Sequence, residues 1–324
     1  MSLFLNAPLP FIAKSSAVVV DPDFVFTVTT TGASETFTIP CQNVGTFDAT
    51  VYWGDGNSNT ITAYNDANLA HTYATAGDHQ IRISGDFPNI YFNNVGDKSK
   101  VKSVDNIGAV GWESFLNAFY GCDNMETFTA GAGADTSSVT SMRLMFRGCT
   151  SVTSIDASTF DTSSVTTMYQ MFFKCEDLTS VDVSGFDTLN HTDTLGMEDM
   201  FRECGSLTSV DVSSFDTSNV TRLRAMFRQC TSLTDIVGVE NLDITGLNQT
   251  YSLDNFITEG GITTNRYDNL LINWKGQFDS SPTPRPGLRP NFGVSQYTNN
   301  SPASTARAVL TGTYSWVITD GGFV

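Results

Sequence analysis

Hydrophobic residues in the middle of the chain follow two periods in turn. After each of five regularly placed cysteines the apolar residues follow L-x-x-V-x-V, as at Leu207, Val210 and Val212. The alternation that ends this pattern predicts a short β-strand. Before the cysteine, apolar residues are three or four positions apart, as at Leu223 and Phe227, which is the spacing of one helical face. We therefore expect each unit to contain a short strand, a turn at Phe-Asp-Thr-Ser, and a short helix or 3₁₀ segment.

The cysteines define a repeated unit. They are Cys122, Cys149, Cys175, Cys204 and Cys230, with spacings of 27, 26, 29 and 26 residues. Such periods are typical of leucine-rich repeats, and the longest spacing includes an insertion around residues 191–194. One unit cannot bury both of its faces, so neighbouring units are expected to stack. We predict a solenoid over residues 88–258, whose degenerate end units place Lys98 and Glu259 at the cysteine position.

Each repeated cysteine is expected to point into the core, where a reduced thiol behaves as a small apolar side chain. A disulfide between adjacent units remains an alternative, because stacked strands about 4.8 Å apart could just permit one. The sequence has no close C-x-x-C pair of the kind that zinc sites use. We therefore predict no metal site and no cofactor, and Cys41, which stands alone, is expected to be buried.

A smaller β unit is expected at residues 21–87, ahead of the repeats. Residues 24–28 and 36–39 alternate as strands do, and the later segments 49–56 and 69–83 contain Gly-Asp-Gly and other turn signals. Strands separated by such turns suggest a β-sandwich.

Residues 259–324 are expected to close the far end of the stack. The pattern predicts an amphipathic helix at 267–274, an extended proline-rich connector at 280–290, a second helix at 304–310 and a final strand at 316–319. Because an uncovered sheet edge invites aggregation, this region is expected to cover the last unit.

The repeated motif MF-x-x-C-x-x-L-x-x-[IV]-D-[VA]-S-x-F-D-T-S-x-V-T-x-M resembles the BspA-like leucine-rich repeats (DUF285-type) of bacterial surface proteins, which also occur in Mycoplasma lipoproteins and phage genomes. The W-G-D-G turn with the later H-x-Y motif is similar to the PKD domain, an immunoglobulin-like module. That resemblance implies that Trp53, Asp55 and His71 are structural, with a calcium or sugar site at Asp55 as the alternative. Together these resemblances imply an α+β chain: a PKD-like β-sandwich, a leucine-rich-repeat solenoid and a C-terminal α/β cap.

Composition narrows the possible partners. The 324 residues include 17 Lys and Arg against 34 Asp and Glu, which gives a net charge of −17. Nucleic-acid binding is not expected, because a phosphate backbone requires clustered cations. No run of 18 apolar residues is present, so we expect no membrane insertion. The first 20 residues lack a basic region and contain Pro8 and Pro10, which makes them a poor secretion signal.

The strand pattern also predicts a polar outer face. With the apolar strand residues directed inward, a ladder of nine residues faces outward: Ser154, Asp156, Ser158, Ser180, Asp182, Ser184, Ser209, Asp211 and Ser213. Stacked aspartates repel one another, so a cation, a basic partner or water is expected to compensate them. This ladder is our candidate partner-binding face, and a plain solvated acidic surface is the alternative.

Two other ladders are expected to be structural or solvated. Asp135, Asp161, Asp187 and Asp216 open the Phe-Asp-Thr-Ser turns, where Asp bonds to backbone amides two residues later. Arg147, Arg202 and Arg228 precede their cysteines by two residues, with Phe173 at the same position of another unit, and form an outward basic stripe. We expect this stripe to be solvated, with partner contact as the alternative.

The sequence favours binding over catalysis. It has no G-x-S-x-G, no H-E-x-x-H and no phosphate loop, so we do not expect an enzyme. Two non-catalytic hypotheses follow: a phage virion surface component, such as a tail or head fibre, receptor-binding or capsid decoration protein, or a BspA-type bacterial cell-surface adhesin. A carbohydrate-binding accessory module is a further alternative. The lack of a visible secretion signal favours the virion, with a host cell-surface protein or glycan as partner.

The apolar start of the chain suggests an attachment segment. We expect residues 1–20 to dock on other virion subunits through Leu3, Phe4, Leu5, Leu9, Phe11 and Ile12. The oligomeric state stays open, and a homo-oligomer is one arrangement that the sequence permits.

Overall fold

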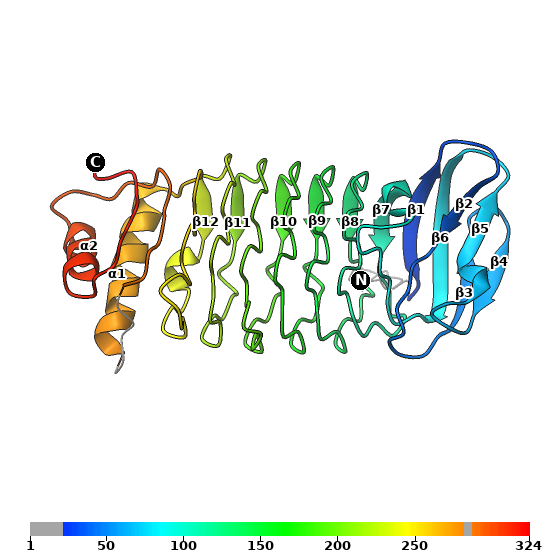
Figure 1. The fold of residues 1–324 in the computed structure, drawn as a ribbon, viewed down its shortest axis with the longest axis horizontal. Coiled ribbons are helices and arrows are strands. Elements are labelled where there is room, and N and C mark those ends of the chain that lie inside the picture. Colours follow the sequence, from blue (N-terminus) through cyan, green and yellow to red (C-terminus); the bar gives the residue numbers. More distant parts are fainter. Residues whose placement is uncertain (1–21, 282–286) are drawn as a thin grey trace, which may run out of the picture.

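The computed structural model describes residues 22–281 and 287–324. Figure 1 shows an elongated molecule with strands β1 to β6 at one end, strands β7 to β12 in a row along the middle, and helices α1 and α2 at the other end. The fold is mostly strands and turns with few helices, so it is α+β. Its main feature is a mixed eight-stranded sheet in the order β10-β9-β8-β7-β1-β6-β3-β4. The predicted attachment segment at residues 1–20 lies outside the described residues.

The N-terminal unit has six strands joined by antiparallel pairs. They are β1 (Phe24–Thr30), β2 (Glu35–Thr38), β3 (Asp48–Tyr52), β4 (Ser58–Ile61), β5 (Ala70–Tyr73) and β6 (Gly77–Asp86), with a 3₁₀ turn η1 (Ala67–Leu69). Strands β2 and β5 form a separate two-stranded sheet. Phe37 of that sheet packs on Phe26 of the large sheet, with ring centroids 6.2 Å apart, so the unit has two layers.

Each repeat then contributes one short strand. These strands are β7 (Val101–Asn106), β8 (Thr127–Thr129), β9 (Ser154–Asp156), β10 (Ser180–Asp182), β11 (Ser209–Asp211) and β12 (Asp235–Val237), with 3₁₀ turns η2 (Lys98–Lys100) and η3 (Val239–Asn241). Parallel pairing joins β7 to β10 in one run, and β11 to β12 in a second sheet. The break between β10 and β11 falls at the repeat that carries the insertion.

The two units share one sheet. Strand β1 pairs antiparallel with β7 and places Phe26 opposite Val104. The first coil therefore has no open edge on that side, because the N-terminal unit supplies its neighbouring strand. The predicted division at residues 87 and 88 thus separates two units whose buried side chains form one continuous hydrophobic cluster.

The expectation of a short helix or 3₁₀ segment before each cysteine is wrong, because this segment is a series of tight turns. Ahead of Cys149, the N–H groups of Met145 and Arg147 bond three residues back, whereas those of Phe146 and Gly148 bond to carbonyls of the next coil. A helix would keep these donors within one coil. Tandem turns still bury the apolar residues that are three and four positions apart, and they leave every second backbone N–H free to bond to the next coil.

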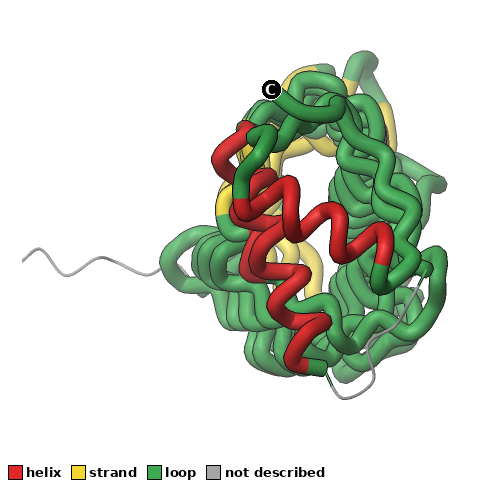
Figure 2. The backbone as a smooth tube through the Cα atoms, turned by 90° about the vertical axis from the view of Figure 1, so that its left-hand side faces the viewer, coloured by secondary structure: helices red, strands yellow, loops and turns green. Residues whose placement is uncertain are grey.

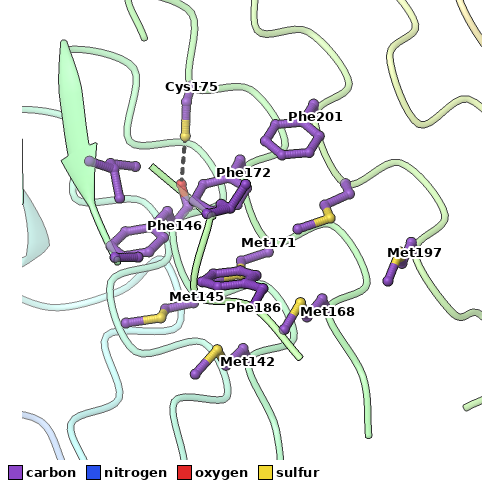
Figure 3. Packing of buried hydrophobic residues seen from close by; sticks show 14 of the residues in the cluster. Met142, Met145, Phe146, Met168, Met171, Phe172, Cys175, Phe186, Met197 and Phe201 are labelled. Atoms are coloured by element: carbon purple, nitrogen blue, oxygen red, sulfur yellow. Dashed lines mark hydrogen bonds between the residues drawn. The ribbon is translucent and has the colours of Figure 1, made fainter. Parts of the chain in front are cut away.

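Matching side chains stack inside the coils (Figure 3). Phe146, Phe172 and Phe201 lie nearly parallel, with successive centroids 5.6 and 5.1 Å apart. The five repeated cysteines are buried and free, as predicted, whereas Cys41 is only partly buried. Cys175 is typical of the repeated thiols: its Sγ lies 3.2 Å from the carbonyl oxygen of Phe146.

The C-terminal region packs on the last coil. Helices α1 (Thr264–Ser280) and α2 (Pro302–Gly312) cross the end of the stack (Figure 2). Buried Trp274 packs between Phe256 of the last coil and Phe292, at centroid distances of 5.9 and 5.8 Å. The cluster closes the core where no further repeat follows.

Three details of this end differ from prediction or lie outside the description. Residues 316–319 do not form a regular strand; Thr319 makes one isolated bridge with Asn291, beside Pro290, which lacks an N–H to extend the ladder. In the other coils this bond reaches the residue before the equivalent phenylalanine, as from Phe201 N to Met226 O. Phe227 N bonds to Phe256 O, so Gly260, not Glu259, is aligned with the repeated cysteines. Residues 282–286 of the predicted connector lie outside the described residues.

Candidate partner-binding face

The predicted ladder lies on the strand side of the coils. The parallel register sets Asp182 beside Asp156 and Ser180 beside Ser154. Ile155 lies between Ser154 and Asp156 on β9 and is 2% exposed, so β9 alternates inward and outward as predicted. Asp211 follows on β11 and completes the row of three exposed aspartates.

Part of this ladder lines a shallow depression of about 500 Å³. Six of the nine predicted residues line it: Ser154, Asp156, Ser180, Asp182, Ser184 and Asp211. Ser158, Ser209 and Ser213 are not among its lining residues. The structure therefore brings the three aspartates to one concavity and leaves three of the serines outside it.

Each aspartate of the ladder is tied to the serine two residues later. Oδ1 of Asp156 accepts hydrogen bonds from the N–H of Ser158 at 3.1 Å and from its hydroxyl at 2.7 Å. Asp182 accepts the same pair from Ser184 at 3.0 and 2.7 Å, and these bonds lower the pKa of Asp182. One oxygen of each carboxylate thus stabilises a turn, while its charge remains at the surface.

The second aspartate ladder makes the same turn. Oδ1 of Asp161 accepts from the N–H and hydroxyl of Ser163, and its pKa is lowered by those bonds. This turn-forming role was predicted for the second ladder alone, but the structure gives it to both. The shared D-x-S spacing is the signal that could have revealed it.

The strand side is negatively charged. Among the described residues, no Lys or Arg forms an ion pair with Asp156, Asp182 or Asp211. All seven Lys and Arg residues between positions 103 and 265 lie within eight residues before a repeated cysteine. The repeats therefore place their cations in the turn segments, away from the strand face.

The predicted basic stripe is a mixed column of cations and rings. Arg147, Arg202 and Arg228 are half-buried, and the position two before each cysteine reads Tyr120, Arg147, Phe173, Arg202, Arg228 along the stack. The Arg147 guanidinium carbon lies 5.1 Å from the Tyr120 ring centre and 4.8 Å from that of Phe173. Tyr120 was not predicted to belong to this column, although the period of the cysteines places it there.

The repeat with the insertion also buries two carboxylates that the sequence pattern did not predict. Glu198 and Asp199 are 6% and 3% exposed. Arg224 Nη1 donates to Glu198 at 2.7 Å, and Gln170 Nε2 donates to Asp199 at 3.0 Å. These bonds offset the free-energy cost of removing the two carboxylates from water. Glu198 and Asp199 therefore link neighbouring coils through buried hydrogen bonds.

The W-G-D-G turn uses its polar groups internally. Buried Trp53 stacks on His71, and His71 Nε2 lies 2.8 Å from Asp55 Oδ2. Burial opposes ionisation of Asp55, but hydrogen bonds from His71 and Asn57 outweigh it and lower its pKa to about 2. Within the described chain, no three His, Cys, Asp or Glu side chains are grouped to hold a metal ion.

The repeats are similar to a known protein family. Residues 113–239 match the DUF285 family. Its description is a Mycoplasma protein of unknown function, and the family is typical of BspA-like surface proteins. The DUF285 segment contains all five repeated cysteines and strands β8 to β12. No curated protein and no solved structure is significantly similar to this chain.

In the described part of the chain, no helix has the length and apolar character needed to span a membrane.

Proposed function

We propose that this chain is a non-catalytic binding protein displayed on a surface. In this proposal the coils form a BspA-like leucine-rich-repeat solenoid, and the N-terminal unit is an immunoglobulin-like, PKD-like sandwich. The DUF285 match and the regular stacking of equivalent residues support the solenoid. The two-layer packing of Phe37 on Phe26 and the closed W-G-D-G turn support the sandwich.

The parallel register of Asp156 and Asp182 carries the proposal of a binding face. The same set of groups, one carboxylate and its neighbouring serine hydroxyls, recurs on adjacent strands. A partner with a repeating structure can therefore make the same contact more than once. The face is rigid because each aspartate is held in its turn and each strand is held by its neighbours. A rigid surface loses little conformational entropy on binding.

The proposed place of display is the surface of a phage virion, and a bacterial cell surface is the second candidate. The DUF285 match favours a surface protein in either setting. Immunogold electron microscopy of virions and intact cells from the source culture separates them. Label on particles supports the virion, and its position at head or tail selects decoration or receptor binding. Label on cell envelopes alone supports the adhesin.

The binding face is tested by replacing Asp156, Asp182 and Asp211 with Asn together. Asn keeps an oxygen in the Oδ1 position, so the turns are retained while three charges are lost. We expect weaker attachment to the host or source cells and an unchanged melting temperature. The matched control replaces Asp161, Asp187 and Asp216, which form the same turns outside the depression. Unchanged attachment of the first variant would return this face to a solvated surface.

A further inference from the structure

A second cavity lies on the turn side of the coils and shares no lining residue with the strand-face depression. Its volume is about 330 Å³, which is at the lower end of the range for small-ligand sites. Four successive repeats line it. Its lining includes Lys98, Tyr120, Asp123, Arg147, Phe173 and Lys174.

Arg147 is the central cation of this cavity. Tyr120 belongs to the coil before it and Phe173 to the coil after it, so the two rings lie on either side of the guanidinium. Nη1 donates to the neutral Oε1 of Gln170 at 2.6 Å. Among the described residues, no carboxylate forms an ion pair with Arg147. The two rings and the Gln170 bond hold the guanidinium in position, and its other N–H groups remain as donors for a ligand.

The walls of the cavity are cationic, although the chain as a whole is acidic. Lys98 Nζ lies 3.0 Å from Asp123 Oδ2, which neutralises one positive charge. Lys174 is 3.6 Å from Glu176, and both side chains are about half exposed, so that pair is weak. Arg147 and Lys174 thus leave a positive site in a chain whose net charge is −17.

The combination of rings and cation occurs once along the column. Among the repeats with a cysteine, Arg147 is the one arginine of the column that has an aromatic residue on each side. Arg202 follows Phe173 but is itself followed by Arg228. Phe173 interrupts the arginines at this position and supplies the second ring. A single, distinct site is expected from such a departure from the repeat, whereas a purely structural column would follow the repeat.

We propose that this cavity binds a carboxylate-bearing sugar unit of an acidic glycan. The edge of a fixed guanidinium matches a carboxylate in a two-point hydrogen-bonded pair, and Lys174 adds a charge at the rim. Asp123 and Thr150 in the wall can exchange hydrogen bonds with sugar hydroxyls. An ionised Asp123 can only accept hydrogen bonds. The wall therefore favours a ligand that carries hydrogen-bond donors, such as sugar hydroxyls, and disfavours phosphate or sulfate.

The test measures binding to the full chain by isothermal titration calorimetry. The probes are oligosaccharides that contain glucuronate or N-acetylneuraminate, their neutral counterparts, and inorganic phosphate. We expect an acidic oligosaccharide to bind, and the neutral sugars and phosphate not to bind. Arg147→Gln is expected to weaken binding about tenfold or more, since a charge-assisted pair is lost.

Arg143→Gln is the matched control. Arg143 also lies over a tyrosine, 4.9 Å from the ring centre of Tyr169, but it does not line the cavity. Both variants should melt alike, and Arg143→Gln should bind as the parent does. Absence of binding to every acidic oligosaccharide, equal binding by Arg147→Gln, or equal binding of phosphate would each overturn the proposal.

This site is separate from the proposed strand face, and the two can fail independently. The triple Asn variant of Asp156, Asp182 and Asp211 should keep full affinity for the acidic oligosaccharide. Loss of affinity in that variant would mean that the sugar binds the strand side, and it would overturn the assignment to the Arg147 cavity.

Discussion

The thiol of Cys175 donates a hydrogen bond to the backbone carbonyl oxygen of Phe146 in the preceding coil, over 3.2 Å. The same contact recurs at 3.2, 3.1 and 3.0 Å for Cys149, Cys204 and Cys230. A cysteine at this position therefore fills a small core space and also joins neighbouring coils.

Replacing Cys175 with Ala should lower the free energy of unfolding by about 1 to 3 kcal/mol, because it removes buried volume and leaves a buried carbonyl with one bond fewer. Urea unfolding measures this. Cys41→Ala is the control, since Cys41 is only partly buried, and it should cost less. An equal loss for both would mean that the repeated position is not special.

The repeated thiols should be unreactive in the folded protein. Burial raises the pKa of Cys175 well above its usual range and that of Cys230 to about 12, so almost no thiolate forms at pH 8. A thiol reagent at pH 8 should leave the five core cysteines unmodified and label them all in guanidinium. Rapid labelling of the native chain would contradict the packing described here.

Thr162 is expected to be the sensitive residue of the Phe-Asp-Thr-Ser turn. Its buried hydroxyl donates to Asp187 O at 2.8 Å and accepts from Asp187 N at 2.7 Å, in the next coil. Thr162→Val keeps the shape but leaves both backbone groups unpaired, so it should cost about 1 to 3 kcal/mol. Thr166→Val, at an exposed site, should change stability by less than about 0.5 kcal/mol in the same urea titration.

The stability of the stack should fall in acid because of His191. This side chain is fully buried in the insertion and its Nδ1 bonds to Thr188 O at 3.0 Å. Burial lowers its pKa from 6.5 to about 4, against the opposing effects of that carbonyl and of Asp187 and Asp193. The unfolded chain therefore binds a proton first, and stability present above pH 6.5 is lost as the pH falls towards 4.

The full loss from this residue is about 3 kcal/mol. Unfolding free energies measured between pH 7 and pH 4.5 should decline less steeply for His191→Gln than for the parent chain. Parallel pH profiles for the two proteins would show that His191 does not titrate as a buried group.

Trp274 should be essential to the C-terminal cover. It is fully buried among Phe256, Phe292 and Trp316, so Trp274→Ala should cost about 3 to 5 kcal/mol and expose the last coil. Light scattering should then show concentration-dependent association. Ile272→Ala on the same helix is the control, because Ile272 is 38% exposed and should leave stability nearly unchanged.

The repeat pattern predicted the strands and the buried cysteines correctly, because inward and outward residues of a strand must alternate. It failed before the cysteines. Spacings such as that of Leu223 and Phe227 suit a helix and also suit tandem turns, and only the bonds to the next coil distinguish them. The turn role of Asp156 was missed for a different reason: its bond to Ser158 is local, but a residue at the end of a strand was not expected to start a turn.

The sequence by itself determined that the repeated cysteines and phenylalanines face the core, that the units repeat, and that the C-terminal region carries two helices. These properties depend on local periodicity, which each segment of the chain contains. Only the tertiary structure decided that β1 continues the sheet at β7, and that Tyr120 and Phe173 enclose Arg147. Those relationships join residues that are distant in sequence, so they exist only after the coils have stacked.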